Sequence, residues 1–231
     1  MQITKDKDIR FISHLEYVRT IGRAIRRAKL PAAYSEGFNP HLKFSLASAL
    51  GVGVVSYTEF VEIELAEPME VEKAALALDA ALPRGIRVLA ADAVDTHHAA
   101  LMSQAAGASY RVTLPYSKDV SVAVAEFNAA PELLFKKAAP KTKAKFKDID
   151  VKFYIPQLTA EQTETETIFS FDCKITPTGS MKAVDLLNAL NEQYGLALPV
   201  EMADIERLRL YRNNKNGKPI PMLNSDAVTL G

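Results

Sequence analysis

The sequence predicts an α+β fold built from two ferredoxin-like units in a pseudo-duplicated arrangement, each with the element order βαββαβ and a mostly antiparallel sheet. Two observations lead to this prediction. Apolar residues recur with a period of two in some segments, as in strands, and with spacings of three and four in others, as in helices. The order of these segments over residues 1–95 recurs, without residue-level similarity, over residues 109–213. We expect a mobile tail over residues 214–231.

The first unit is predicted to open with a strand within residues 2–13, where Ile9 and Phe11 alternate with their neighbours. Ser13 and Glu16 then form the S-x-x-E pattern of a capping box, which marks the start of a helix. The helix ends at Leu30, because the residue before a proline disfavours helical backbone. Its core face is formed by Leu15, Val18, Ile21, Ile25 and Ala28.

Gly22 lies on that same apolar face in the middle of the helix. Glycine there costs about 1 kcal/mol of helix propensity relative to alanine, which predicts that the helix backbone packs closely against a sheet. The rest of the unit is expected to contain a loop over residues 34–41, strands over 43–49 and 58–65, a helix over 71–82 and a strand over 86–94.

The second unit is predicted to follow a bridge of uncertain structure over residues 95–109. Alternating apolar residues indicate strands, and spacings of three and four indicate helices. In chain order we expect strand 110–116, helix 117–129, strand 133–137, a lysine-rich insertion, segment 151–158, strand 167–176, helix 180–194 and strand 205–212.

Composition narrows the class of protein. The chain has 28 Lys+Arg and 28 Asp+Glu residues, which argues against binding a polyanion by bulk charge alone. A single cysteine, Cys173, excludes an internal disulfide and a thiolate metal cluster. The longest uncharged stretch, residues 44–58, is shorter than the roughly 20 residues of a membrane span, and the first residues lack the apolar region of a signal peptide. We therefore expect a cytoplasmic protein without membrane association or cofactor.

Two basic clusters are candidates for phosphate binding. The first expected helix carries Arg19, Arg23, Arg26 and Arg27, and guanidiniums match phosphate bidentately. Alternatively, they form a solvated face near the helix C-terminus, where the macrodipole favours cations. The insertion carries Lys136, Lys137, Lys141, Lys143, Lys145 and Lys147, which can neutralise several phosphates; alternatively it is a soluble loop.

The loop over residues 34–41 contains a candidate stacking residue and one of two candidate catalytic residues. Phe38 either stacks on a base or plugs the core beneath its own loop. His14 and His41 could together support acid–base cleavage of RNA. The alternative is that each is a capping or turn histidine.

One further pattern comes from the segments 10–16, 30–41 and 43–45, together with Arg19 and the run from Arg23 to Ala28. These resemble the N-terminal signature of a bacterial family of unknown function that is known as radical-SAM-associated. The resemblance implies a radical SAM protein as partner, and gene neighbours in ribosome and RNA biology. The resemblance implies no enzymatic activity for this chain. The chain also has no CxxxCxxC cluster of its own.

The predicted function is an RNA-binding accessory module, for tRNA or rRNA, that acts with a radical SAM protein and has no catalytic activity of its own. The predicted RNA contacts are Arg19, Arg23, Arg26, Arg27, Phe38, Lys43, Lys141, Lys143, Lys145 and Lys147. Two alternatives remain. One is a metal-independent endoribonuclease of the CRISPR repeat-processing type that uses His14 or His41, and the other is a protein-protein adaptor.

Overall fold

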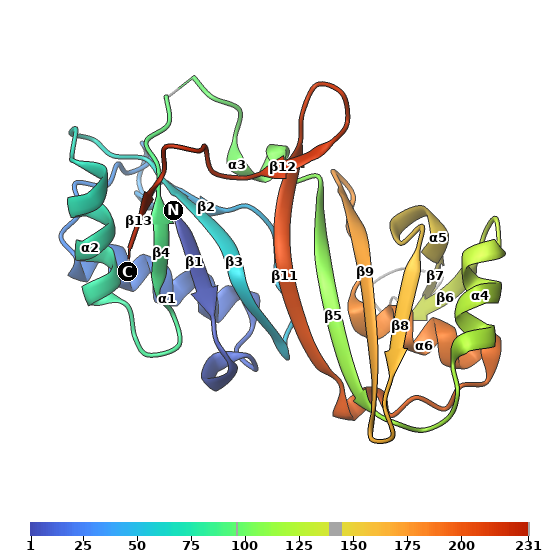
Figure 1. The fold of residues 1–231 in the computed structure, drawn as a ribbon. Coiled ribbons are helices and arrows are strands. Elements are labelled where there is room, and N and C mark those ends of the chain that lie inside the picture. Colours follow the sequence, from blue (N-terminus) through green and yellow to red (C-terminus); the bar gives the residue numbers. More distant parts are fainter. Residues whose placement is uncertain (96, 139–144, 231) are drawn as a thin grey trace. The chain divides into compact units, whose positions relative to one another are not determined.

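The computed structural model describes residues 1–95, 97–138 and 145–230. The chain divides into two compact units, which are Met1–Ala106 with Arg209–Gly231, and Gly107–Leu208. Helices and mostly antiparallel strands occur in both (Figure 1), which confirms the α+β fold class. Within the described residues, no helix combines the length and the apolar character needed to cross a bilayer.

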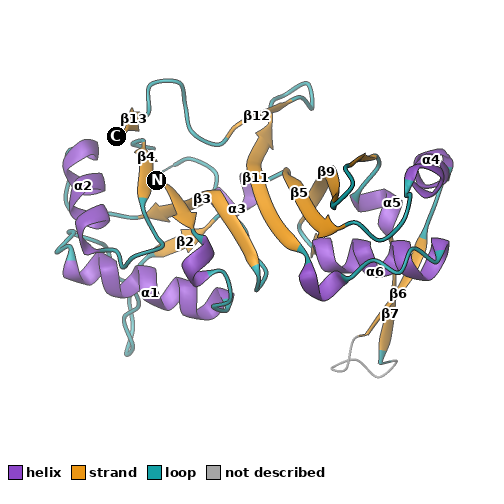
Figure 2. Cartoon of the chain, turned by 60° about the horizontal axis from the view of Figure 1, so that its bottom comes forward, coloured by secondary structure: helices purple, strands orange, loops and turns teal. Residues whose placement is uncertain are grey.

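The first unit is a sheet with two helices on one face. Its elements are β1 (Gln2–Lys5), the 3-10 helix η1 (Lys7–Ile9), α1 (His14–Arg27), β2 (Phe44–Leu46), β3 (Val54–Ile63), α2 (Val71–Ala81), β4 (Val88–Ala91), α3 (Leu101–Gln104), β12 (Pro219–Pro221) and β13 (Val228–Thr229). The strand order is β4-β1-β3-β2, and each of these neighbours is antiparallel. α1 and α2 lie side by side (Figure 2), and their apolar faces share one core with Ile3 and Val61.

Helix α1 begins as the sequence predicts. The Ser13 hydroxyl accepts a hydrogen bond from the Glu16 N–H at 3.2 Å, and the Glu16 carboxylate accepts one from the Ser13 N–H at 3.0 Å. The predicted close approach at Gly22 is also confirmed. A Cβ atom at Gly22 would lie only 3.2 Å from the Phe44 ring of β2, so this glycine lets the helix pack against the sheet.

The first strand is shorter than predicted. It occupies Gln2–Lys5, and Ile9 and Phe11 do not extend it. The chain turns instead, because the Asp6 carboxylate accepts a hydrogen bond from the Lys7 N–H and caps η1. Lys5 is only 1% exposed, and its ammonium donates to the carbonyls of Arg10 and Gly51 at 2.8 and 3.2 Å. This buried lysine joins two loops that are far apart in the sequence.

The second unit is a sheet with α6 across one face (Figure 2). Its elements are β5 (Gly107–Pro115), α4 (Ser121–Ala129), β6 (Leu134–Ala138), β7 (Phe146–Asp150), α5 (Val151–Tyr154), β8 (Leu158–Gln162), β9 (Glu166–Thr176), β10 (Gly179–Ser180), α6 (Ala183–Tyr194), the 3-10 helix η2 (Val200–Met202) and the first half of β11 (Asp204–Asn213). The sheet order is β8-β9-β5-β11, with β10 also on β9.

Segment 151–158 differs from the single element expected there. It begins with the short helix α5, and β8 starts only at Leu158. The reason is a local cap, because the Asp150 carboxylate accepts a hydrogen bond from the Lys152 N–H at 3.0 Å and turns the chain. β6 and β7 pair only with each other and form a separate hairpin.

The C-terminal segment contains two short strands. β12 pairs with β11, and β13 pairs with β4. The Asn224 side-chain amide donates to the Asp92 carboxylate at 2.7 Å. Residues 209–230 are therefore part of the first unit, and its strand β13 extends the sheet beyond β4.

Candidate nucleic-acid interface

Three arginines form an exposed stripe along α1. Arg19, Arg23 and Arg26 are spaced by four and three residues and all are exposed, because the opposite face of the helix is buried against the core. Arg26 reaches back to the Gly22 carbonyl of its own helix at 3.5 Å. Hydrogen bonds from the Ser13 N–H and hydroxyl lower the pKa of Glu16, and the charge of Arg19 adds a smaller lowering. We call these three residues the arginine stripe.

Arg27 and Lys43 have other contacts. The Arg27 guanidinium donates to the Ala81 carbonyl at 2.7 Å, where the C-terminal end of α2 concentrates negative partial charge. The Lys43 ammonium lies 2.9 Å from the Glu64 carboxylate. Both cations are thus already paired within the first unit, which separates them from the arginine stripe.

The loop after α1 holds Phe38 away from the core. The Ser35 N–H donates to the His41 carbonyl at 2.8 Å, and the His41 N–H donates to the Ser35 hydroxyl at 2.9 Å. The two ends of the loop are thereby tied together, and Gly37 supplies a positive φ of 112°. Phe38 is completely exposed, so it does not plug the core.

His14 and His41 lie on different elements. His14 is the first residue of α1. His41 lies in the loop after that helix, where its N–H donates to the Ser35 hydroxyl and its carbonyl accepts a hydrogen bond from the Ser35 N–H. That the two imidazoles act together as an acid and base pair stays a prediction.

The lysine hairpin is our name for β6 and β7 with their lysines. Its base is buried through Leu133, Phe135 and Val151. Further out, Lys136, Lys145 and Lys147 are exposed, and Phe146 is half exposed. Lys137 is different, because its ammonium donates to the Asp185 carboxylate of α6 at 2.6 Å. The remaining predicted contacts, Lys141 and Lys143, lie outside the described residues.

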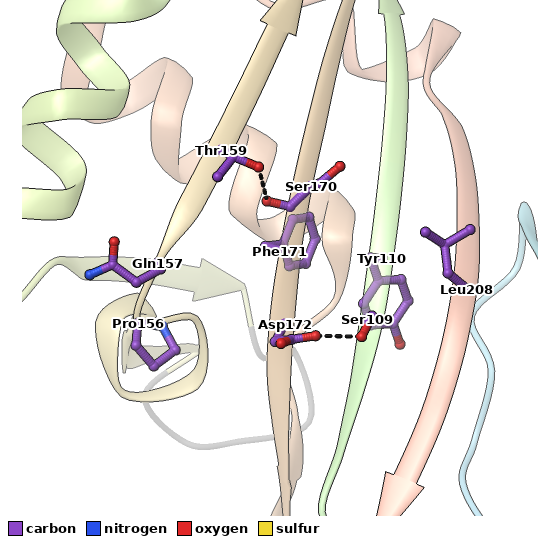
Figure 3. Close-up of a pocket in the computed structure, with 9 residues that line it drawn as sticks. All are labelled: Ser109, Tyr110, Pro156, Gln157, Thr159, Ser170, Phe171, Asp172 and Leu208. Carbon is purple, nitrogen blue, oxygen red and sulfur yellow. Dashed lines mark hydrogen bonds between the residues drawn. The ribbon is translucent and has the colours of Figure 1, made fainter. Parts of the chain in front are cut away.

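A cleft of about 460 Å³ lies in the second unit, and the sequence did not predict it. Its lining includes Ser109 of β5, Thr159 of β8, and Ser170 and Asp172 of β9 (Figure 3). The Ser109 hydroxyl donates to the Asp172 carboxylate, and the Thr159 hydroxyl donates to the Ser170 carbonyl at 3.2 Å. The alternation of β9, with Phe169 and Phe171 buried and the polar Ser170 and Asp172 at the alternate positions, is the sequence signal that could have located this surface.

The described residues contain no group of three or more His, Cys, Asp and Glu side chains arranged to hold a metal ion. Cys173 is buried, and burial raises the pKa of its thiol to about 11. The exposed residues described above include cations, an aromatic ring and hydroxyl groups.

Comparisons with known proteins give a family and distant structural likenesses. A chain of the crystal structure of a Cbf5-Nop10-Gar1 complex is similar with a TM-score of 0.42 and 12% sequence identity, over 87% of this chain and 46% of that one. The chain thus spans less than half the length of that solved chain. No curated protein matches the sequence. Residues 1–185 match the family DUF2344, described as uncharacterized protein conserved in bacteria, and the chain therefore belongs to this family.

Proposed function

We propose that this protein is an RNA-binding accessory module without catalytic activity of its own. One observation carries the proposal: Phe38 is completely exposed at the tip of a loop whose two ends are hydrogen-bonded to each other. Exposing a phenylalanine to water is unfavourable by about 1.5–3 kcal/mol relative to burial. A base that stacks on the ring recovers part of this free energy.

The distribution of charge supports the same function. The net charge is zero, yet cations gather on the arginine stripe and on the lysine hairpin, which are both exposed. Guanidiniums and ammoniums at such positions neutralise phosphates and release counterions. Arg27, Lys43 and Lys137 are left out of the proposed contacts, because each lies within 2.9 Å of a carbonyl or carboxylate oxygen of the protein, whereas the contact of Arg26 is 3.5 Å long.

The architecture supports a finer interpretation, in which both units are ferredoxin-like. The strand order is β4-β1-β3-β2 in the first unit and β11-β5-β9-β8 in the second. If the four strands of each βαββαβ series are numbered 1 to 4 along the chain, both sheets have the order 4-1-3-2. In this interpretation the lysine hairpin and α5 are an insertion between the first helix and the second strand of the second unit.

The experiment is a titration of fluorescent single-stranded RNA, followed by anisotropy across a series of salt concentrations. Phe38→Ser should weaken binding at every salt concentration, because base stacking contributes about 1–3 kcal/mol per base. Leu76→Ser is the matched control, since Leu76 is an exposed apolar residue on α2. Absence of binding at low salt, or equal effects of the two variants, would show that the proposal is wrong.

The salt dependence of RNA binding tests the contribution of the lysine hairpin. Replacing Lys145 and Lys147 with glutamine should reduce the slope of log K against log salt by about 0.7 for each phosphate that these lysines neutralise. The same double change at the exposed Lys73 and Lys215 controls for net charge. An unchanged slope would exclude the lysine hairpin from the interface.

The partner is proposed from the family resemblance alone. We expect the protein to co-purify with a radical SAM protein encoded near it, and to do so after nuclease treatment. Co-purification that nuclease abolishes would make RNA the link between the two. Recovery of a different, acidic protein partner without any RNA binding would instead favour the adaptor function.

A further inference from the structure

The cleft of the second unit has a floor of small hydroxyl residues. Ser109 and Asp172 lie directly opposite each other in the β5–β9 ladder, and Thr159 and Ser170 are opposite in the β8–β9 ladder. Side chains of neighbouring strands at such positions share a face of the sheet. Short side chains at the centre of this face leave the cleft open, and about 460 Å³ is within the usual size of small-ligand sites.

Asp172 determines which chemistry the cleft can accept. Its carboxylate is exposed, and an ionised carboxylate only accepts hydrogen bonds. The Ser109 hydroxyl uses one acceptor position on Oδ1, which leaves Oδ2 and a second position on Oδ1 for a ligand. The Asp172 carboxylate would repel a phosphate that contacts it directly, whereas it would bind a group with two neighbouring N–H donors.

The aromatic residues at the cleft do not offer a stacking surface. The Tyr110 and Phe171 rings stack on each other with centroids 5.5 Å apart, and they are only 8% and 6% exposed. Apolar contact comes instead from Leu208, which is 41% exposed, and from Pro156. Recognition in this cleft therefore relies on hydrogen bonds to its polar floor, with apolar contacts at its sides.

We propose that the cleft binds an unpaired guanine base of the RNA, and this proposal rests on the proposed function. The Watson–Crick edge of guanine presents N1–H and N2–H side by side, and the Asp172 carboxylate can accept both in a bidentate contact. Adenine and cytosine place a ring acceptor beside their amino group, and uracil has one N–H between two carbonyls. These three bases would each direct at least one lone pair at the carboxylate.

Arg111 gives the bound nucleotide a second anchor. It lies opposite Ser170 in the β5–β9 ladder and is exposed on the same face as the cleft floor. A guanidinium there can bind the phosphate of the nucleotide whose base contacts Asp172. In this arrangement the Asp172 carboxylate binds the base of the nucleotide, and the Arg111 guanidinium binds its phosphate.

The test uses the four free nucleosides as probes in calorimetric titrations of the whole chain. Guanosine should bind about tenfold or more tightly than the other three, and inosine, which lacks the N2 amino group, should lose about tenfold. Asp172→Asn should abolish the preference, because the amide replaces one acceptor with a donor. Asp148→Asn on the exposed part of β7 is the matched control and should keep the preference.

Failure of this proposal can be told apart from failure of the proposed function. If RNA binds and responds to Phe38→Ser while guanosine binds no better than the other nucleosides, only the guanine site is wrong. If guanosine binds and RNA does not, the RNA-binding function is wrong. Binding of an arginine-rich peptide that depends on Asp172, without binding of any nucleoside, would overturn the proposal in favour of a cationic protein partner.

Discussion

Lys137 of β6 and Asp185 of α6 form an ion pair, with Nζ and Oδ2 2.6 Å apart and side chains that are 31% and 12% exposed. In the hairpin ladder Lys137 lies directly opposite Lys147, and like charges at opposite positions destabilise a strand pair. The Asp185 carboxylate compensates one of the two charges. The ion pair therefore holds the lysine hairpin against α6 and leaves Lys147 exposed.

Breaking this ion pair should destabilise the second unit. Asp185→Asn keeps the shape of the side chain and removes its charge, and we expect a loss of about 1–3 kcal/mol in the free energy of unfolding. Lys137→Met should have a similar effect, while the double variant Lys137→Met/Asp185→Leu should be closer to the wild type. Urea unfolding followed by circular dichroism measures this, with Asp148→Asn as control. Single variants with an unchanged midpoint would contradict a positioning role for the ion pair.

The contact between Gly22 and Phe44 predicts coupling between these positions. Gly22→Leu should destabilise the protein by about 1–3 kcal/mol, because the added atoms overlap the ring. Gly22→Ala gains about 1 kcal/mol of helix propensity, but its Cβ would lie 3.2 Å from the Phe44 ring. In a Phe44→Leu background the alanine should therefore be more stabilising than in the wild type. A double-mutant cycle by chemical denaturation measures the coupling, and strictly additive effects would contradict the contact.

Local signals explain why α1 could be predicted closely from the sequence. The capping box joins Ser13 and Glu16, three residues apart, and Ile21 and Ile25 of the predicted apolar face are buried. Leu15, which was expected on the same face, is 57% exposed. Even the packing of Gly22 followed from its place on that face. Such features depend on neighbours within one or two helical turns, so tertiary structure adds little to them.

Long-range contacts explain the parts that could not be predicted. The sequence left open whether Phe38 is exposed or fills the core beneath its own loop. The structure leaves it exposed, in a loop whose ends are joined by the hydrogen bonds between Ser35 and His41. Ser109 and Asp172 are 63 positions apart in the sequence, and their contact depends on the register of β5 and β9. Segment 151–158 departs from the single expected element for a different reason, because the Asp150 side chain caps a short helix there.

Asp79 should make stability depend on pH. Burial tends to raise the pKa of this carboxyl, but hydrogen bonds from Arg87 and the Val88 N–H, with the charge of Arg87, lower it below its ordinary 3.8. A carboxyl with a lowered pKa in the folded state stabilises the protein above its unfolded pKa and loses this effect as the pH falls through the folded pKa. Asp79→Asn should therefore cost about 1–2 kcal/mol near neutral pH and progressively less below pH 3.8.

Urea unfolding of the wild type and Asp79→Asn at several pH values tests this expectation. Glu72→Gln, at an exposed position of the same helix, is the matched control for replacing a carboxylate with an amide. A gap between the wild type and Asp79→Asn that stays constant down to low pH would mean that the carboxylate does not act through its charge.

Cys173 should be protected from thiol reagents in the folded protein. It is 1% exposed, and burial raises the pKa of its thiol to about 11 from an ordinary 9.0, so near pH 8 the reactive thiolate is about 100-fold less abundant than in an unperturbed thiol. Labelling should therefore proceed through unfolding and accelerate strongly in urea. Ser117→Cys in a Cys173→Ser background places a thiol at an exposed position and should react rapidly without denaturant. Equally fast labelling of the native wild type would show that the structure opens locally around Cys173 of β9, whose thiol contacts the Met181 carbonyl.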